Sequence, residues 1–305
     1  MFKLLPREKP SFDPENTIAE QQPTETLQQN KTQYMISVLQ SDGTLCEMDI
    51  EQYLLGVLLG EMPLDFDIEA LKAQAVVART YTLRRCTVAP KHQQNAVCTI
   101  SSCCQAYCSE QAYQAKGGSS EAVKKADLAI SATFGQVVTY NGALIEATYF
   151  SCSGGRTEDA LAVWGTDIPY LQSVDSPGEE NATHHTDTVR FSAAEFAGLI
   201  GQTLPGSVAN WFGTVTYTDG GGVASIEIGE KIYKGTELRQ MLGIQSTAFT
   251  ITPMGDAVYV TTKGYGHRVG MSQYGAEAMA VSGSNYDAIL QHYYPGTTLT
   301  EYNAD

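Results

Sequence analysis

A helix with one apolar face, ended by a proline, is the strongest constraint that this sequence places on the fold. The apolar side chains recur with helical spacing at Ile50, Tyr53, Leu54, Val57 and Leu58. Asp49 followed by Gln52 is typical of a capping box at a helix start, and Pro63 stops the helix. The pattern therefore predicts a helix from 49 to about 60 that buries one face in a core.

Glu61 continues this buried face at the helix end, four residues after Val57 and three after Leu58. A carboxyl group held against apolar surface keeps its proton near neutral pH and can act as a general acid. The alternative is a surface glutamate on a frayed last turn, because burial of this kind marks only some functional sites. Glu61 is therefore the candidate catalytic acid.

Charge and length exclude several classes of protein. The chain has 305 residues, enough for one large domain or two smaller ones. Its formal net charge of −15 argues against nucleic acid and anionic membranes as main partners. No apolar run reaches the length of about 18 residues that a membrane helix needs. Residues 1–9 are basic but carry too few apolar residues for a signal peptide, so no export signal is visible.

The order of patterns predicts a mixed α+β fold. Residues 1–33 are polar and rich in Gln, Thr, Glu and Pro, which indicates a disordered tail or tether. The remainder, 34–301, divides into an N-terminal part at 34–177, an inserted mixed subdomain at 178–250 and a C-terminal glycine loop with helices at 251–301. Strands are expected at 34–39, 43–48, 136–139, 143–150 and 257–262, and helices at 49–60, 68–85, 119–129, 192–200, 236–242, 272–282 and 286–294.

Five of the seven cysteines crowd into residues 86–108, which favours a metal site over a disulfide framework. Four candidate ligands fall within thirteen residues and suit a tetrahedral, structural Cys3His zinc site: His92, Cys98, Cys103 and Cys104. Cys86 and Cys108 are possible substitutes. The alternative is a pair of local disulfides, one of them between Cys103 and Cys104, but only a metal would use His92.

A glycine loop at 264–270 follows a strand and precedes a helix. Its third glycine is one position too late for a dinucleotide-binding loop, so that function is rejected. The glycines together with His267, Gln273 and Tyr274 suit the close approach of a sugar, although a tight turn before a capped helix explains them equally well. Cys152 lacks the sequence frame of a nucleophile and is expected to be a buried thiol.

Several long motifs in a fixed order resemble the stage II sporulation protein D (SpoIID) family, and the similarity runs from about 34 to 299. The motifs are EMP at 61–63, EALKAQA at 69–75, ARTY at 78–81, SCSGG at 151–155, GTELR at 235–239, GH at 266–267, VGMSQYGA at 269–276 and HYYPGT at 292–297.

The resemblance implies a lytic transglycosylase that cleaves peptide-stripped peptidoglycan glycan strands during engulfment in sporulation. Glu61 would be its single catalytic acid and base. The implied partners are the glycan strands and a peptidoglycan amidase–endopeptidase, and the implied location is the extracytoplasmic, cell-wall face of the septal membrane.

The resemblance also implies site residues. Some family members carry zinc on a His, Cys, His, Cys set at the positions of His92, Cys98, Cys103 and Cys104, so Cys103 replaces a histidine here. Arg268 stands where the family usually has glycine, which puts bulk and charge in the loop. The expected glycan contacts are Arg79, Tyr149, Ser151, His267, Gln273 and Tyr274.

Two other functions remain open at this stage. One is a non-catalytic wall-binding module that enhances an amidase, which some relatives resemble. The other is a purely structural zinc protein. The predicted fold places Glu61 on a helical face, beside a zinc-clamped loop and a C-terminal segment that closes the glycan cleft.

Overall fold

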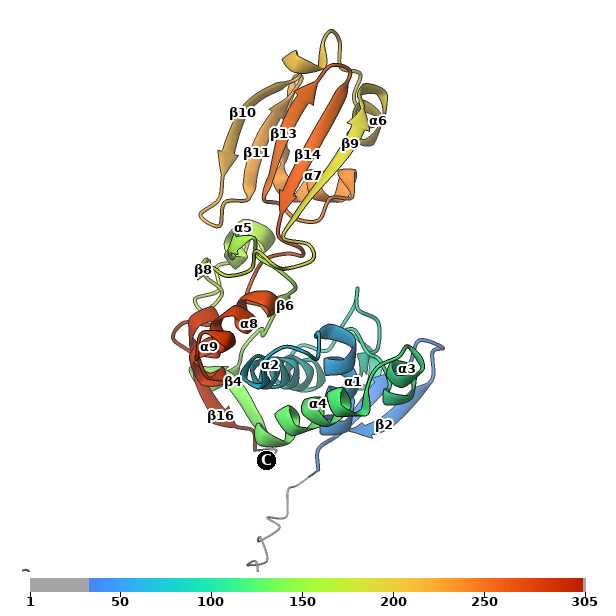
Figure 1. Ribbon diagram of the computed structural model, residues 1–305, viewed down its shortest axis with the longest axis vertical. Helices are drawn as coiled ribbons and strands as arrows, with labels where there is room; N and C mark the ends of the chain where they lie inside the picture. The colour runs from blue at the N-terminus through green and yellow to red at the C-terminus, as the bar shows by residue number, and fades with distance from the viewer. Residues whose placement is uncertain (1–32, 304–305) are drawn as a thin grey trace, which may run out of the picture. The chain divides into compact units, whose positions relative to one another are not determined.

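A computed structural model describes residues 33–303 of the chain (Figure 1). The predicted tail at 1–33 falls, apart from Gln33, outside these residues. Within the described range the chain forms nine α-helices and several sheets of two or three strands, which confirms a mixed fold of helices and strands. None of the helices in this range has the length and apolar character needed to cross a membrane.

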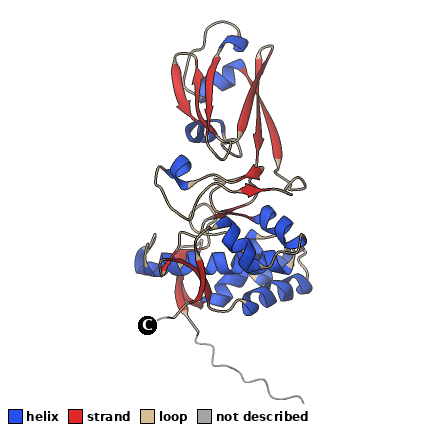
Figure 2. Cartoon of the chain, turned by 90° about the vertical axis from the view of Figure 1, so that its left-hand side faces the viewer, coloured by secondary structure: helices blue, strands red, loops and turns tan. Residues whose placement is uncertain are grey.

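The helices are distributed along the whole described chain (Figure 2). They are α1 (Ile50–Glu61), α2 (Ile68–Thr87), α3 (Glu110–Ala115), α4 (Ser120–Ala132), α5 (Ala160–Trp164), α6 (Ala193–Leu199), α7 (Gly235–Leu242), α8 (Gln273–Val281) and α9 (Tyr286–Tyr293). All seven predicted helices are present, whereas α3 and α5 were not predicted.

Most of the strands are short. They are β1 (Met35–Leu39), β2 (Leu45–Asp49), β3 (Val97–Cys98), β4 (Gln136–Tyr140), β5 (Ala143–Leu144), β6 (Tyr149–Phe150), β7 (Gly155–Arg156), β8 (Asp175–Ser176), β9 (Thr186–Ser192), β10 (Phe212–Tyr217), β11 (Val223–Ile228), β12 (Lys231–Lys234), β13 (Phe249–Met254), β14 (Ala257–Lys263), β15 (Met271–Ser272) and β16 (Thr298–Glu301).

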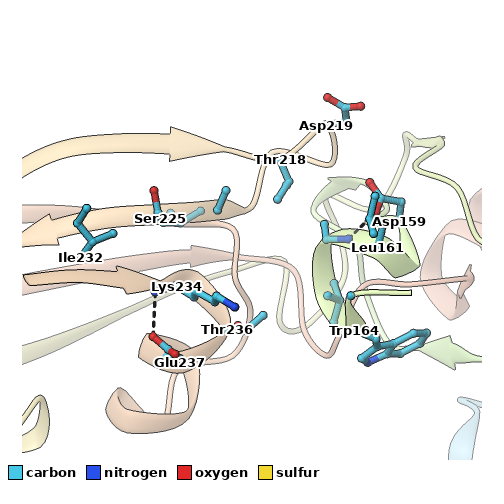
Figure 3. A pocket seen from close by; sticks show the side chains of 15 residues that line it. Asp159, Leu161, Trp164, Thr218, Asp219, Ser225, Ile232, Lys234, Thr236 and Glu237 are labelled. Carbon is cyan, nitrogen blue, oxygen red and sulfur yellow. Dashed lines mark hydrogen bonds between the residues drawn. The ribbon is translucent and has the colours of Figure 1, made fainter. Parts of the chain in front are cut away.

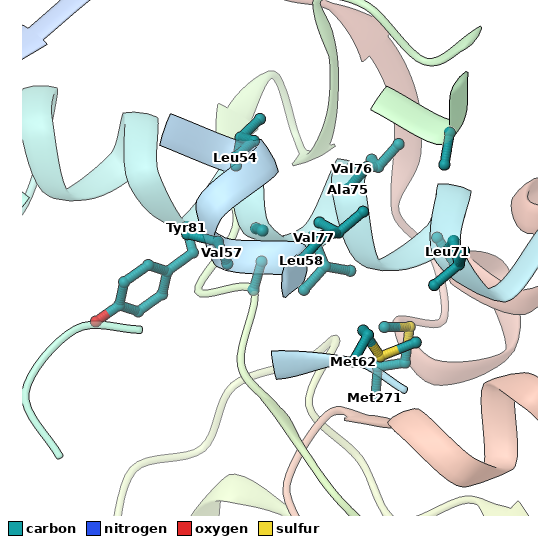
Figure 4. Packing of buried hydrophobic residues seen from close by; sticks show 14 of the residues in the cluster. Leu54, Val57, Leu58, Met62, Leu71, Ala75, Val76, Val77, Tyr81 and Met271 are labelled. Atoms are coloured by element: carbon teal, nitrogen blue, oxygen red, sulfur yellow. The ribbon is translucent and has the colours of Figure 1, made fainter. Parts of the chain in front are cut away.

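Helix α2 forms the centre of the first hydrophobic core. It is buried over most of its length because α1, α4, α8, α9 and strand β4 all pack against it (Figure 1). Leu54, Val57 and Leu58 of α1 meet the aliphatic side chains of α2 in this core (Figure 4). The predicted apolar face of α1 is therefore confirmed. Asp49 caps the helix by accepting from the amides of Glu51 and Gln52.

A second hydrophobic core lies in the sheets β13-β14-β9 and β10-β11-β12, together with α6 and α7. Its buried residues run from Phe191 to Val260. The boundary predicted at 250 falls inside β13, and β14 from the following segment pairs with both β13 and β9. This packing unit therefore continues through β14.

Three long-range strand pairings bring distant segments together. Strand β3 of the cysteine-rich segment pairs in parallel with β1, and β15 pairs in parallel with β6. Strand β16, near the C-terminal end, pairs with β4. These pairings place the cysteine-rich segment and the segment before α8 close to the end of α1.

Candidate functional site

A pocket of about 770 Å³ collects polar and aromatic side chains from several separate parts of the chain. Glu61 lies at the end of α1, while Tyr149 and Ser151 come from β6 and its end. His267 and Gln273 come from the glycine loop and the start of α8. The further lining residues include Tyr81, Arg85, Lys91, Ser101, Cys103, Cys104, Glu146, Thr148, Phe150, Trp164, Thr166, Ile168, Tyr265 and Gly266.

Glu61 is held by the segment that follows the cysteine cluster. The backbone amide of Ala106 donates to Oε1 of Glu61 over 2.5 Å, and Nε2 of Gln273 donates to the Glu61 carbonyl oxygen over 3.2 Å. Glycines on α1 permit this approach, because a Cβ at Gly60 would lie 2.9 Å from the Ala106 backbone. A Cβ at Gly56 would likewise enter the ring of Tyr107. The two glycines of the GVLLG sequence in α1 thus leave room for the Ala106–Tyr107 segment to approach the carboxyl group of Glu61.

The surroundings of Glu61 favour its neutral form. Burial raises the pKa of Glu61, although the hydrogen bond from the Ala106 amide and the nearby polar groups of Tyr149 and Gln273 oppose part of this rise. Glu61 is also the last residue of α1, where the negative end of the helix dipole disfavours a carboxylate. Glu61 thus has the surroundings expected of a proton donor at neutral pH.

A chain of polar side chains continues from Glu61 into the core. The hydroxyl of Tyr149 donates to Oε1 of Gln105 over 3.1 Å, and Nε2 of Gln105 donates to Thr82 over 3.0 Å. Burial and the nearby Glu61 raise the pKa of Tyr149 well above its usual range, so the phenol stays protonated. The network fixes the wall of the pocket beside the carboxyl group.

His267 is a neutral hydrogen-bonding group in this pocket. Burial, assisted by the positive charge of Arg239, lowers the pKa of His267 to about 4. Its Nδ1 accepts from the amide of Val269 over 3.1 Å, so the proton of the neutral ring resides on Nε2. The ring lies 5.6 Å from that of Phe150 and 5.4 Å from that of Trp164.

Arg79 and Tyr274 do not lie with the other predicted contact residues. The Arg79 side chain is 1% exposed and pairs with Glu51 through two hydrogen bonds of 2.5 and 2.8 Å. It also donates to backbone carbonyls, so its position fits a structural role and not a glycan contact. Tyr274 packs edge-on against Phe66, 5.0 Å away, outside the pocket lining.

Arg268 adds bulk and charge to the loop, as expected, but its side chain turns away from the pocket. Its backbone adopts the left-handed conformation (φ 64°), which suits the glycine expected there. The side chain is 2% exposed and turns inward to pair with Glu158 at 3.2 Å. Nε donates to the carbonyl of Ser153, and Nη2 donates to those of Arg156 and Gly220.

The four predicted metal ligands converge in the structure. Nε2 of His92 lies 3.3 Å from Sγ of Cys103 and 3.6 Å from Sγ of Cys104, and the four ligand atoms are all within 4.8 Å of one another. Zinc with ordinary bond lengths would separate tetrahedral nitrogen and sulfur ligands by about 3.5 Å. The donor set therefore fits a zinc ion, and the cysteines at these positions are free thiols.

Cys152 is buried, as the sequence predicted, and its thiol donates to Glu179 over 3.1 Å. Burial and the negative charge of Glu179 raise the pKa of Cys152 to about 12, which opposes a role as nucleophile. Oε2 of Glu179 also accepts from the amides of Ser153 and Gly154. Cys152 and Glu179 thus support the turn behind the pocket.

Sequence reasoning missed several residues of the pocket. Tyr81 belongs to the ARTY motif, but Arg79 of that motif was predicted as the glycan contact instead. Trp164 lies at the end of a short helix that was not predicted. Lys91 precedes the candidate ligand His92, which was the available signal for it. The amide of Ala106 carries no sequence signal, because backbone groups are identical at every non-proline residue.

Trp164 also borders a second hollow, of about 790 Å³, between α5 and the strands β11 and β12, with the turn that follows β10 (Figure 3). The close view shows Leu161 and Trp164 of the α5 segment on one side and Ile232, Lys234 and Glu237 on the other.

Comparisons with known proteins identify the family. Residues 39–140 match the family model described as stage II sporulation protein. The chain is 41% identical to stage II sporulation protein D of Bacillus subtilis, covering 84% of this chain and 75% of that protein. It is 38% identical to the protein of the same name from Bacillus amyloliquefaciens, over 86% and 77%. It is also 30% identical to an amidase enhancer of B. subtilis, over 82% of this chain and 40% of that protein.

At this identity and coverage, and with residues from several of the family's motifs lining one pocket, the chain belongs to the stage II sporulation protein D family.

Proposed function

We propose that this chain is a lytic transglycosylase that cleaves the bond between N-acetylmuramic acid and N-acetylglucosamine in peptide-stripped glycan strands of peptidoglycan. Its setting is the extracytoplasmic face of the septum during sporulation, next to a peptidoglycan amidase–endopeptidase. The observation that carries the proposal is Glu61, a half-buried carboxyl group with a raised pKa in a pocket lined by hydrogen-bonding and aromatic side chains.

One carboxyl group suffices for this reaction. Glu61 donates its proton to the bridging oxygen as the bond from that oxygen to C1 of the muramoyl residue breaks. The carboxylate then takes the proton of the C6 hydroxyl of the same sugar, whose oxygen bonds to C1. The products are a free 4-hydroxyl end and a 1,6-anhydromuramoyl end, and no water is consumed. Hydrolysis would instead require a second carboxylate on the opposite face of the sugar.

Other lining residues support binding. Tyr149, Ser151, His267 and Gln273 line the pocket, and the neutral His267 ring is held by hydrogen bonds to the backbone of Val269 and Tyr149. Aromatic faces at Trp164 and Tyr265, which are 42% and 44% exposed, suit the apolar faces of sugar rings. In this proposal they orient the strand while Glu61 transfers the proton.

We also propose that His92, Cys98, Cys103 and Cys104 hold a structural zinc ion. Four protein ligands leave no open position for a water molecule, so zinc would fix the loop and take no part in bond cleavage.

Glu61→Gln tests the catalytic proposal, because glutamine keeps the shape but cannot deliver a proton. We expect release of anhydromuramoyl ends from peptide-free glycan strands, measured by mass spectrometry, to fall by about 10²- to 10⁴-fold. Glu121→Gln, at the exposed start of α4, is the control and should cleave like the unaltered chain. Undiminished anhydromuramoyl release by Glu61→Gln would refute the role of Glu61.

The second candidate function is a non-catalytic enhancer of a peptidoglycan amidase. Identity of 30% to an amidase enhancer favours it. Such a protein would bind glycan strands without releasing anhydromuramoyl ends, and Glu61→Gln would leave its stimulation of an amidase intact. Assaying the same variant for anhydro ends and for amidase stimulation therefore separates the two functions.

A further inference from the structure

Lys91 lines the same pocket as Glu61 and is held in a defined direction. Its Nζ donates to the hydroxyl of Tyr81 over 3.0 Å and to the carbonyl oxygen of Cys103 over 2.6 Å. The Tyr81 ring leaves the packed core with its hydroxyl directed away from the aliphatic cluster (Figure 4). An ammonium group has three N–H donors, so Lys91 keeps one for a ligand.

No carboxylate of the described residues neutralises Lys91. The salt bridges found between residues 33 and 303 involve other cations: Lys72, Arg79, Arg84, Arg85, Arg156 and Arg268. Both neighbours that accept from Lys91 are uncharged oxygens.

Two cationic groups lie at or near this wall: Lys91, and the cluster of Arg84, Arg85 and Glu146, of which Arg85 and Glu146 line the pocket. Arg84 and Arg85 share the single carboxylate of Glu146, which leaves this group with one positive charge. Lys91 adds another. A zinc ion on three thiolates and a neutral imidazole would carry one negative charge, which offsets only one of the two. In a chain of net charge −15, an ammonium group without a carboxylate partner, in the same pocket as an acid whose pKa is raised, suits an anionic ligand.

We propose that Lys91 binds the lactyl carboxylate of the N-acetylmuramic acid residue placed next to Glu61. This inference rests on the proposed function, because it concerns the sugar that the same pocket would cleave. The lactyl carboxylate is free on a peptide-stripped strand, whereas on a peptide-bearing strand it is an amide with no charge. Lys91 therefore makes the pocket selective for stripped strands, and also against glycans of N-acetylglucosamine alone, which have no lactyl group.

Binding measurements on the full chain with Glu61→Gln avoid turnover and test this directly. Three tetrasaccharides serve as probes: the peptidoglycan repeat with free lactyl groups, the same repeat with lactyl amides, and the tetramer of N-acetylglucosamine. Adding Lys91→Met to the Glu61→Gln chain should weaken binding of the free-lactyl probe by roughly 10-fold, because the charged hydrogen bond is lost. Binding of the other two probes should stay unchanged. Lys91→Arg should retain most of the affinity.

Lys231→Met is the matched control, because Lys231 is an exposed lysine on β12 outside this pocket. It should bind all three probes normally. Unaltered free-lactyl affinity in Lys91→Met would overturn the inference. Equal weakening for all three probes would also overturn it, because the lysine would then support the loop and not the carboxylate.

Failure of the proposed function gives a different result. If the chain with Glu61 intact releases no anhydromuramoyl ends, transglycosylase activity is refuted, yet a Lys91-dependent preference for the free-lactyl probe would still establish the carboxylate subsite. If anhydro ends form and Lys91→Met changes no preference, the inference about Lys91 fails alone.

Discussion

Glu61 illustrates how a single residue's position and surroundings reinforce each other. Its place at the end of α1 follows from local sequence, since Asp49 starts the helix and Pro63 prevents its continuation. Its desolvation follows from distant segments, since Ala106 and Gln273 approach it from 45 and 212 residues away. Both the burial and the end of the helix dipole favour the neutral acid.

The raised pKa of Glu61 predicts a stability effect of a definite sign. Because the folded state holds this proton more tightly than the unfolded chain does, the folded state loses stability as the pH rises from the ordinary glutamate pKa through the raised one. Glutamine does not titrate. The stability of Glu61→Gln relative to the unaltered chain should therefore increase with pH across this window, by about 1.4 kcal/mol for each unit of pKa elevation.

Urea unfolding at a series of pH values measures this difference. Glu121→Gln, an exposed glutamate, should show no such trend. If the difference in unfolding free energy between Glu61→Gln and the unaltered chain is the same at every pH, Glu61 ionises in the folded chain as it does in the unfolded one.

Residues that depend on distant partners could not be placed from sequence. Arg79 shares helix α2 with Tyr81, which lines the pocket, but its bidentate partner Glu51 is 28 residues away on α1. Nothing in the local pattern distinguishes an arginine that faces a pocket from one that joins two helices. Arg268 is similar, because its left-handed backbone turns the side chain toward Glu158, 110 residues earlier in the chain.

At the scale of elements, the segment 91–108 connects the candidate metal site to the candidate acid. Strand β3 attaches the segment to β1, and the four ligand residues gather immediately around it. The same segment presents the Cys103 carbonyl to Lys91 and the Ala106 amide to Glu61. A metal that fixes this segment would therefore position both pocket residues without contacting substrate.

Metal analysis and removal test this connection. We expect about one equivalent of zinc per chain, and chelation should lower the unfolding temperature by roughly 5 °C or more and speed amide hydrogen exchange at 97–106. Release of anhydromuramoyl ends should also fall when zinc is removed, because the Ala106 amide then moves away from Glu61. Cys46→Ser, outside the cluster, should keep its zinc. Less than about half an equivalent of zinc, together with absent free thiols, would indicate disulfides instead.

Elements with strong local signals were predictable, and elements defined by long-range pairing were not. Asn141 and Gly142 both have positive φ in the turn between β4 and β5, as a tight hairpin requires. Ser192 and Glu195 form a complete capping box at α6. In contrast, β3 and β15 are two-residue strands in parallel pairs, and two residues carry no periodicity.

At the scale of the molecule, the Glu158–Arg268 pair connects segments that are distant in sequence. Oε1 of Glu158 accepts from the Gly222 amide and from Thr218, in the turn between β10 and β11. Arg268 belongs to the glycine loop beside His267, and it also donates to Gly220 in that turn. The pair therefore links the second core to the loop that lines the pocket. Glu158 is fully buried, and its Oε2 has no hydrogen-bond partner, so it depends on Arg268 for compensation.

Arg268→Gly would restore the residue that the family resemblance led us to expect, with two opposing effects. Relief of the left-handed backbone should stabilise the fold by about 1 kcal/mol. Loss of the partner leaves a buried carboxylate unpaired, which costs about 3–5 kcal/mol. We expect a net loss of about 2–4 kcal/mol in urea unfolding, partly recovered when Glu158→Gln is added. Arg156→Gln, which breaks the exposed pair with Asp175, should cost less than about 1 kcal/mol. A more stable Arg268→Gly chain would show that the backbone conformation outweighs the ion pair.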